Sequence, residues 1–125
     1  MLRSESKEIE GSVYHVRVLG ATEGRKLLVR LMRVLGPALG EFLVNRKGEA
    51  LADSDVLPAI AILGQRLTEE DLEYVVAKFA ETTEVEKEGK KIVLSKIQEL
   101  HFAGNYLAMF KWLWFCLQTN FTAAF

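Results

Sequence analysis

The sequence has one cysteine, no basic excess and no long apolar run, and each shortage excludes a class of protein. Cys116 alone cannot form an intramolecular disulfide or a cysteine-rich zinc site. Lysine and arginine number 16 against 17 acidic residues, giving a net charge of −1, whereas a dedicated nucleic-acid-binding domain carries a marked positive charge. Residues 1–8 are charged and lack the apolar core of a secretory signal. We therefore expect an intracellular protein that does not bind nucleic acid.

Residues that catalyse reactions or hold metals are also scarce. His15, His101 and Cys116 are the only histidines and cysteine, and no two have the spacing of a metal site on a helix. The sequence contains no glycine-rich phosphate loop and no nucleophile elbow. Only their residue types would suggest Cys116 and His101 as a nucleophile and its base. The sequence therefore predicts no catalytic residue, no cofactor and no metal. A small enzyme or metal protein is the function that we rank last.

The spacing of apolar residues predicts an α+β fold that is mainly helical, with four to five helices and a small antiparallel sheet. Residues 1–11 are polar and lack a period, so we expect a flexible N-terminal segment followed by a single α+β domain over 12–125. The sheet is expected to contain an N-terminal strand over 12–19 and a β-hairpin over 82–94, whose turn lies at 87–90.

Helical spacing and capping residues together position the helices. The predicted helices cover 23–35, 56–67, 69–81 and 106–119, with shorter helical turns at 38–44 and 95–101. The expected N-terminal caps are Thr22, Asp53 or Ser54, Thr68 and Asn105.

The last predicted helix is apolar on nearly every side and is rich in aromatic residues. Such a helix either forms the centre of the core or presents aromatic side chains to a partner chain, and the pattern allows both alternatives. On the second alternative, the partner-binding residues are Phe110, Trp112, Trp114, Phe115, Phe121 and Phe125. The apolar run includes Lys111 and is shorter than the roughly 20 residues that span a membrane.

A second candidate surface is basic. Lys26, Arg30 and Arg33 recur at helical spacing on the side of the first predicted helix that faces away from its leucines. Such a stripe is either an ordinary solvated helix face or a surface that binds an acidic segment of a partner.

The order of these segments resembles that of a bacteriophage tail assembly chaperone family. The resemblance lies in the serial order of motifs from residue 14 onward, and none of the motifs is a catalytic signature. The matching segments are Tyr14–Leu19, Leu27–Leu39, Leu57–Ile60, Leu67–Tyr74, the predicted hairpin and His101–Phe121.

The resemblance implies a non-enzymatic assembly factor in the cytoplasm of the host bacterium. Chaperones of this family coat the long tape measure protein while tail tube subunits polymerise around it, and they often self-associate. The implied partners are therefore the phage tape measure protein, a tail tube protein and further copies of the chain, but no membrane. A different class of function is a small structural tail or baseplate component that stays in the virion.

Overall fold

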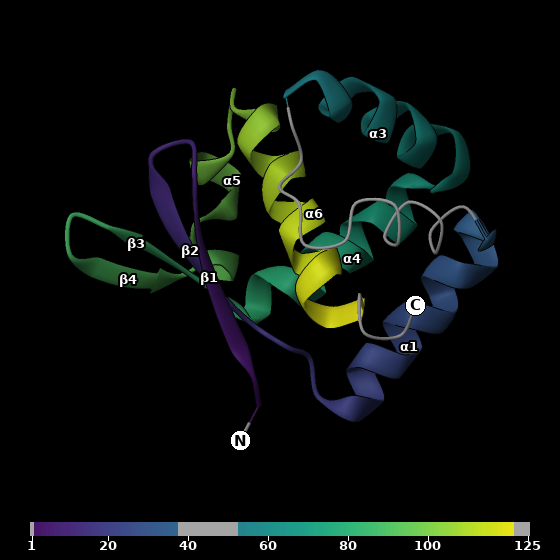
Figure 1. The fold of residues 1–125 in the computed structure, drawn as a ribbon, viewed down its shortest axis with the longest axis horizontal. Coiled ribbons are helices and arrows are strands. Elements are labelled where there is room, and N and C mark those ends of the chain that lie inside the picture. The colour runs from purple at the N-terminus through teal and green to yellow at the C-terminus, as the bar shows by residue number, and fades with distance from the viewer. Residues whose placement is uncertain (1, 38–52, 122–125) are drawn as a thin grey trace.

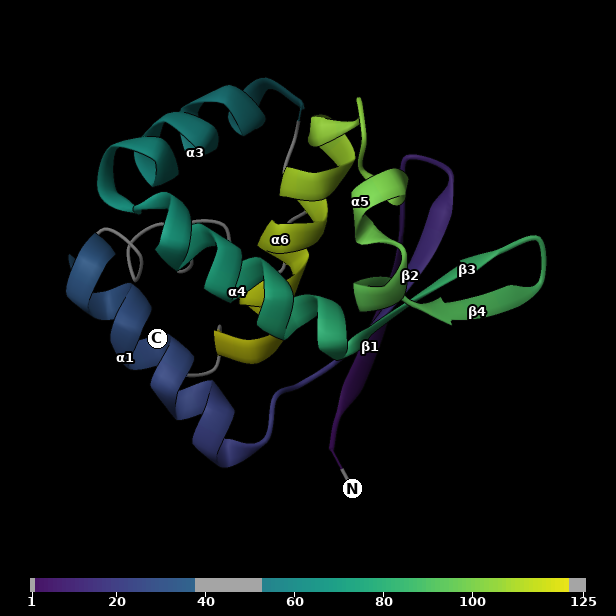
Figure 2. The same ribbon diagram turned by 180° about the vertical axis from the view of Figure 1, so that it is seen from behind.

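The computed structural model describes residues 2–37 and 53–121, which form a four-stranded antiparallel sheet and five α-helices. The prediction of a mainly helical α+β fold with a small antiparallel sheet is confirmed. The predicted helical turns over 38–44 and the candidate residue Phe125 lie outside the described residues. Figures 1 and 2 show the sheet on one side of the molecule and most of the helices on the other, with the C-terminal helix between them.

The sheet has the strand order β1-β2-β3-β4, and every neighbouring pair is antiparallel. Its strands are β1 (Ser4–Ile9), β2 (Ser12–Arg17), β3 (Thr83–Lys87) and β4 (Lys90–Val93). Strand β2 and the β3–β4 hairpin lie where the sequence predicts them. The alternation of side chains in β2 places Tyr14 and Val16 in the core, as expected for the apolar face of a half-buried strand.

Strand β1 corrects the prediction of a flexible segment over residues 1–11. It pairs with β2 along its whole length. Glu10 and Gly11 connect the two strands with φ of 47° and 85°, the left-handed backbone of a tight hairpin turn. The sequence does not reveal β1 because glutamate and lysine are depleted in strands, and Ile9 is its only fully buried residue.

The helices lie close to their predicted positions. They are α1 (Ala21–Leu35), α3 (Asp53–Arg66), α4 (Glu69–Glu81), α5 (Gln98–His101) and α6 (Tyr106–Phe121), with a 3₁₀ turn at Leu94–Lys96. Within the described ranges, no helix combines the length and the apolar character that crossing a membrane requires.

Two of the predicted helix caps are confirmed and two are wrong. Asp53 and Ser54 are the first two residues of α3, so neither of them is its N-cap. The Thr68 hydroxyl accepts a hydrogen bond of 3.0 Å from the third residue of α4, and the Asn105 side chain accepts one of 3.3 Å from the third residue of α6. Thr22 instead lies in the first turn of α1, whose N-cap is Gly20 without a side-chain hydrogen bond. The extended backbone of Gly20 already provides the first helical acceptor, so the helix begins before Thr22.

Helix α6 forms the centre of the core. It packs against β1 and β2 on one side and against α3 and α4 on the other, as Figures 1 and 2 show. A helix that is apolar all round is stable in water only when neighbouring elements cover it on all sides. The first of the two alternatives for this helix, a central core helix, is therefore the one that the fold adopts.

Candidate partner-binding surface

Four of the aromatic residues that the sequence offers as partner-binding residues lie in the core, namely Trp112, Trp114, Phe115 and Phe121. The solvent-exposed fraction is 0% for Trp112, 4% for Trp114, 8% for Phe115 and 4% for Phe121. Phe110 is half-buried and packs against the same core. A partner cannot reach the four buried rings without opening the fold, because the sheet and the other helices already cover them.

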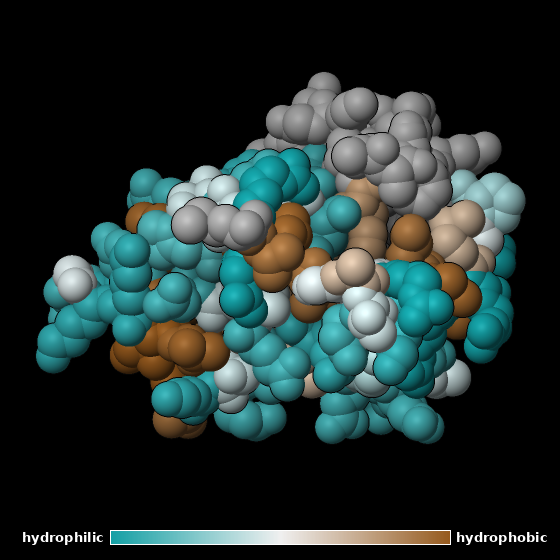
Figure 3. Space-filling model, turned by 90° about the horizontal axis from the view of Figure 1, so that it is seen from below, coloured by the Kyte–Doolittle hydropathy of each residue, from teal (hydrophilic) through white to brown (hydrophobic). Residues whose placement is uncertain are grey.

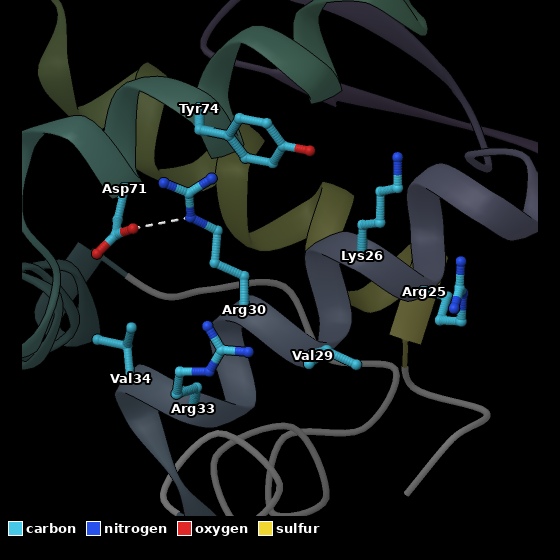
Figure 4. A pocket seen from close by; sticks show the side chains of 8 residues that line it. All are labelled: Arg25, Lys26, Val29, Arg30, Arg33, Val34, Asp71 and Tyr74. Carbon is cyan, nitrogen blue, oxygen red and sulfur yellow. Dashed lines mark hydrogen bonds and ion pairs between the residues drawn. The ribbon is translucent and has the colours of Figure 1, made fainter.

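The basic residues of α1, in contrast, line an open groove. One side of α1 packs into the core through Leu27, Leu31 and Leu35. The cations occupy the other side. The groove has a volume of about 580 Å³ and extends from α1 to α4 (Figure 4). We call it the basic groove, and its lining residues are Arg25, Lys26, Val29, Arg30, Arg33, Val34, Asp71 and Tyr74. The structure thus brings Lys26, Arg30 and Arg33 together in one concave surface.

Arg30 is the one of these cations that α4 holds in place. Its Nε donates a hydrogen bond of 2.8 Å to Oδ1 of Asp71, and its guanidinium lies 4.3 Å from the centre of the Tyr74 ring. Hydrogen bonds from Arg30, and then from Thr68, lower the pKa of Asp71 below its ordinary value of 3.8. The carboxylate therefore stays charged at neutral pH and keeps the guanidinium extended toward α4, as Figure 4 shows.

The other three cations have no carboxylate partner among the residues that the structure describes. Arg25, Lys26 and Arg33 are exposed, and each lines the basic groove without an ion pair to the described part of the chain. Among the residues that the structure describes, the lining of the groove therefore contains four cations and one carboxylate, that of Asp71. Figure 3 shows that the surface over α1, on the right of that view, is mainly hydrophilic.

The basic groove also has an apolar component. Val29, at the centre of the row of cations, is 50% exposed, although valine is an apolar residue. Val34 and the Tyr74 ring line the same groove. This combination of cations with apolar side chains is suited to a polypeptide segment that carries both carboxylates and apolar residues.

Sequence reasoning missed several residues of this groove. Arg25 and Val29 lie one turn apart on α1 next to the predicted stripe, so a full helical projection of α1 would have included them. Asp71 and Tyr74 belong to α4, and Asp71 follows Arg30 by 41 positions. No local spacing signals such a contact, because it depends on how the two helices pack.

Cys116 and His101 have separate hydrogen-bond partners in the structure. Cys116 is fully buried, its Sγ lies 4.0 Å from Oγ1 of Thr83, and burial raises the pKa of its thiol. His101 Nε2 lies 2.7 Å from the hydroxyl of Tyr14 instead. Neither side chain is arranged to activate the other.

Ser6, His15 and Glu86 form a hydrogen-bonded row on the face of the sheet that points away from the helices. The Ser6 hydroxyl lies 2.6 Å from Nδ1 of His15, and Nε2 of His15 lies 3.1 Å from a carboxylate oxygen of Glu86. These residues belong to three neighbouring strands, so the row joins the strands across a solvated face. In the described part of the chain, no group of three or more histidine, cysteine or acidic residues is placed to hold a metal ion.

Comparison with known proteins confirms the family resemblance that the order of segments in the sequence predicts. A family model described as "Phage tail assembly chaperone protein, TAC" matches residues 10–125. The match includes α1 and α4, which form the basic groove, and α6, which forms the core. Neither the curated proteins nor the solved structures contain a match to the chain.

Proposed function

Because the chain belongs to the phage tail assembly chaperone family, we propose that it binds the tape measure protein while the tail is assembled. The observation that carries this proposal is the family match, which extends over nearly the whole chain. Binding alone protects an aggregation-prone chain, so the proposed role is non-enzymatic and needs no cofactor. The proposed place of action is the cytoplasm of the host bacterium.

The basic groove is the surface through which we propose that the chain binds its partner. Lys26, Arg30 and Arg33 are accessible there, whereas the rings of Trp112 and Trp114 are enclosed in the core. A tail tube protein and further copies of the chain are proposed as additional partners.

Co-expression with the tape measure protein tests the proposed function. The tagged chain and the tape measure protein are produced together in a bacterium, purified through the tag and analysed by size-exclusion chromatography. We expect the two proteins to co-elute, and we expect more tape measure protein in the soluble fraction than when it is produced alone. An unrelated tagged protein of similar size and charge serves as the control. Equal amounts of soluble tape measure protein in both cases, without co-elution, would contradict the proposal.

The alternative function, a structural tail or baseplate component, predicts a different outcome in the finished particle. A chaperone acts before the tube encloses the tape measure protein, so we expect the chain to be absent from purified virions. Quantitative mass spectrometry of the particles measures this directly. A fixed whole number of copies per virion would support the structural component and would contradict the chaperone.

A further inference from the structure

We infer that the basic groove binds an acidic helical segment of the partner, whose carboxylates pair with Lys26, Arg33 and the free N–H groups of Arg30. The inference rests on the proposed function and adds the chemistry of the segment that is bound. Its basis is the charge of the groove, whose described lining residues are four cations and one carboxylate, that of Asp71. A partner that supplies carboxylates would neutralise this local excess.

The spacing of the cations indicates a helical partner. Lys26, Arg30 and Arg33 are separated by four and then three positions, so they lie in a row along two turns of α1. Seven residues of a helix extend over about 10.5 Å, and a second helix laid along α1 repeats its side chains at the same interval. The complementary segment therefore carries acidic residues at positions i, i+3 or i+4, and i+7, in the helix-in-groove mode of recognition.

The surroundings of Arg30 prepare it for such a partner. Asp71 accepts a hydrogen bond from Nε of Arg30, and the Tyr74 ring lies against its guanidinium. An arginine side chain has five N–H donors, so a partner carboxylate can still accept hydrogen bonds from the terminal nitrogens. Because α4 already holds the side chain extended, less conformational entropy is lost when the partner binds.

The apolar component of the groove favours a polypeptide over a nucleic acid. Val29 and Val34 line the groove together with the cations, and an acidic amphipathic helix can cover them with its own apolar residues. The net charge of −1 gives the chain no general attraction for nucleic acid.

Charge reversal in the groove tests the inference. In the double variant Lys26→Glu with Arg33→Glu, like charges would face the acidic segment, and we expect the affinity for the tape measure protein to fall by about tenfold or more. The matched control is Lys90→Glu with Lys91→Glu, which makes the same change in net charge on the exposed residues of β4. Strand β4 lies on the opposite side of the molecule from α1 (Figure 1).

Binding is measured by titration of the purified chain into fragments of the tape measure protein, at low and at high NaCl concentration. We expect the wild type and the β4 variant to bind alike, and both to weaken as salt screens the charges. We also expect the bound fragment to carry the acidic spacing described above, and its glutamine-substituted form to bind more weakly. Circular dichroism checks that every variant is folded. If the charge-reversed groove unfolds the chain, Lys26→Gln with Arg33→Gln replaces it.

The possible outcomes separate the inference from the proposed function. If the wild type does not bind any fragment of the tape measure protein, the proposed function itself fails. If the wild type binds but the groove variant binds equally well, or the β4 variant is equally impaired, only the inference is overturned. Labelled single-stranded and duplex DNA are tested at the same salt concentrations. Binding of DNA by the wild type and not by the groove variant would also overturn the inference.

Discussion

The indole nitrogen of Trp112 lies 3.1 Å from the side-chain oxygen of Thr83 and donates a hydrogen bond to it. The Thr83 hydroxyl in turn donates a hydrogen bond of 2.8 Å to the carbonyl oxygen of Phe79. Trp112 belongs to α6, Thr83 begins β3 and Phe79 lies in α4, so two hydrogen bonds join three elements inside the core. The indole N–H and the Thr83 hydroxyl therefore each donate a hydrogen bond. This lets both polar groups be buried at little cost in free energy.

Replacing Trp112 by alanine is therefore expected to destabilise the fold strongly. The substitution Trp112→Ala opens a cavity and leaves the Thr83 hydroxyl without its donor, and we expect the free energy of unfolding to fall by about 3–5 kcal/mol. Urea denaturation followed by circular dichroism measures the change. The control is Tyr106→Ala on the same helix, where the aromatic residue is 62% exposed, and we expect a change within about 0.5 kcal/mol. A similar loss for both variants would show that the burial of Trp112 does not explain the loss of stability.

Two threonines near helix N-termini are expected to differ in their contribution to stability. Thr68 accepts a hydrogen bond from the backbone of Asp71 and caps α4, so we expect Thr68→Ala to lower the free energy of unfolding by about 0.5–2 kcal/mol. Thr22 lies inside the first turn of α1 and makes no capping hydrogen bond, so Thr22→Ala is expected to change it by less than about 0.5 kcal/mol. Thermal and urea denaturation of the two variants measure the difference, and a larger loss at Thr22 would contradict the cap assignment.

The sequence predicts the helices and the β3–β4 hairpin because their signals are local. Thr68 and Asn105 cap the helices that follow them, and the apolar alternation of β2 shows which face is buried. Strand β1 carries polar residues, and its place at the edge of the sheet depends on pairing with β2. Local sequence does not encode that pairing strongly enough to predict the strand.

The candidate site could be predicted only in part, for two physical reasons. A helix that is apolar on all sides, such as α6, fits equally well inside a core or against a partner, and tertiary packing decides between them. The stripe of Lys26, Arg30 and Arg33 follows from helical geometry alone and is therefore visible in the sequence. The pairing of Arg30 with Asp71 depends on how α1 and α4 pack, so the sequence does not reveal it.

Gly36 ends α1 with a backbone conformation that other residues adopt at a cost. Its φ of 60° and ψ of −149° lie in a region that is almost restricted to glycine. We expect Gly36→Ala to lower the free energy of unfolding by about 1–3 kcal/mol. The matched control is Gly64→Ala in α3, where an added Cβ has no atom within 4 Å and φ is not positive, and we expect a gain of about 0.4–1 kcal/mol. Urea denaturation gives both values, and a loss at Gly64 equal to that at Gly36 would contradict the backbone explanation.

The partly buried position of His101 is expected to make stability depend on pH. Burial, and then the nearby charge of Lys87, lower the pKa of His101 below its ordinary value of 6.5. The unfolded chain therefore binds this proton at a higher pH than the folded chain does. The contribution of His101 to stability is fully present above pH 6.5 and is lost as the pH falls through the lowered pKa.

Comparison with His101→Gln isolates this contribution. The variant has no titrating group at the position, while its side chain can still form a hydrogen bond with the Tyr14 hydroxyl. We expect the free energy of unfolding to fall less steeply for the variant than for the wild type as the pH is lowered from about 7.5 to about 5. Urea denaturation at several pH values gives the two slopes. Equal slopes would show that His101 does not contribute to this pH dependence.

The burial of both tryptophans has a practical consequence for solution studies. Trp112 and Trp114 are the only tryptophans in the chain, and both are enclosed by the core, whereas the basic groove is lined by residues of α1 and α4. Their ultraviolet emission should therefore shift to longer wavelength when the fold opens and water reaches the rings. A ligand bound to α1 should leave that emission nearly unchanged. Tryptophan fluorescence would therefore report whether the chain is folded, independently of partner binding.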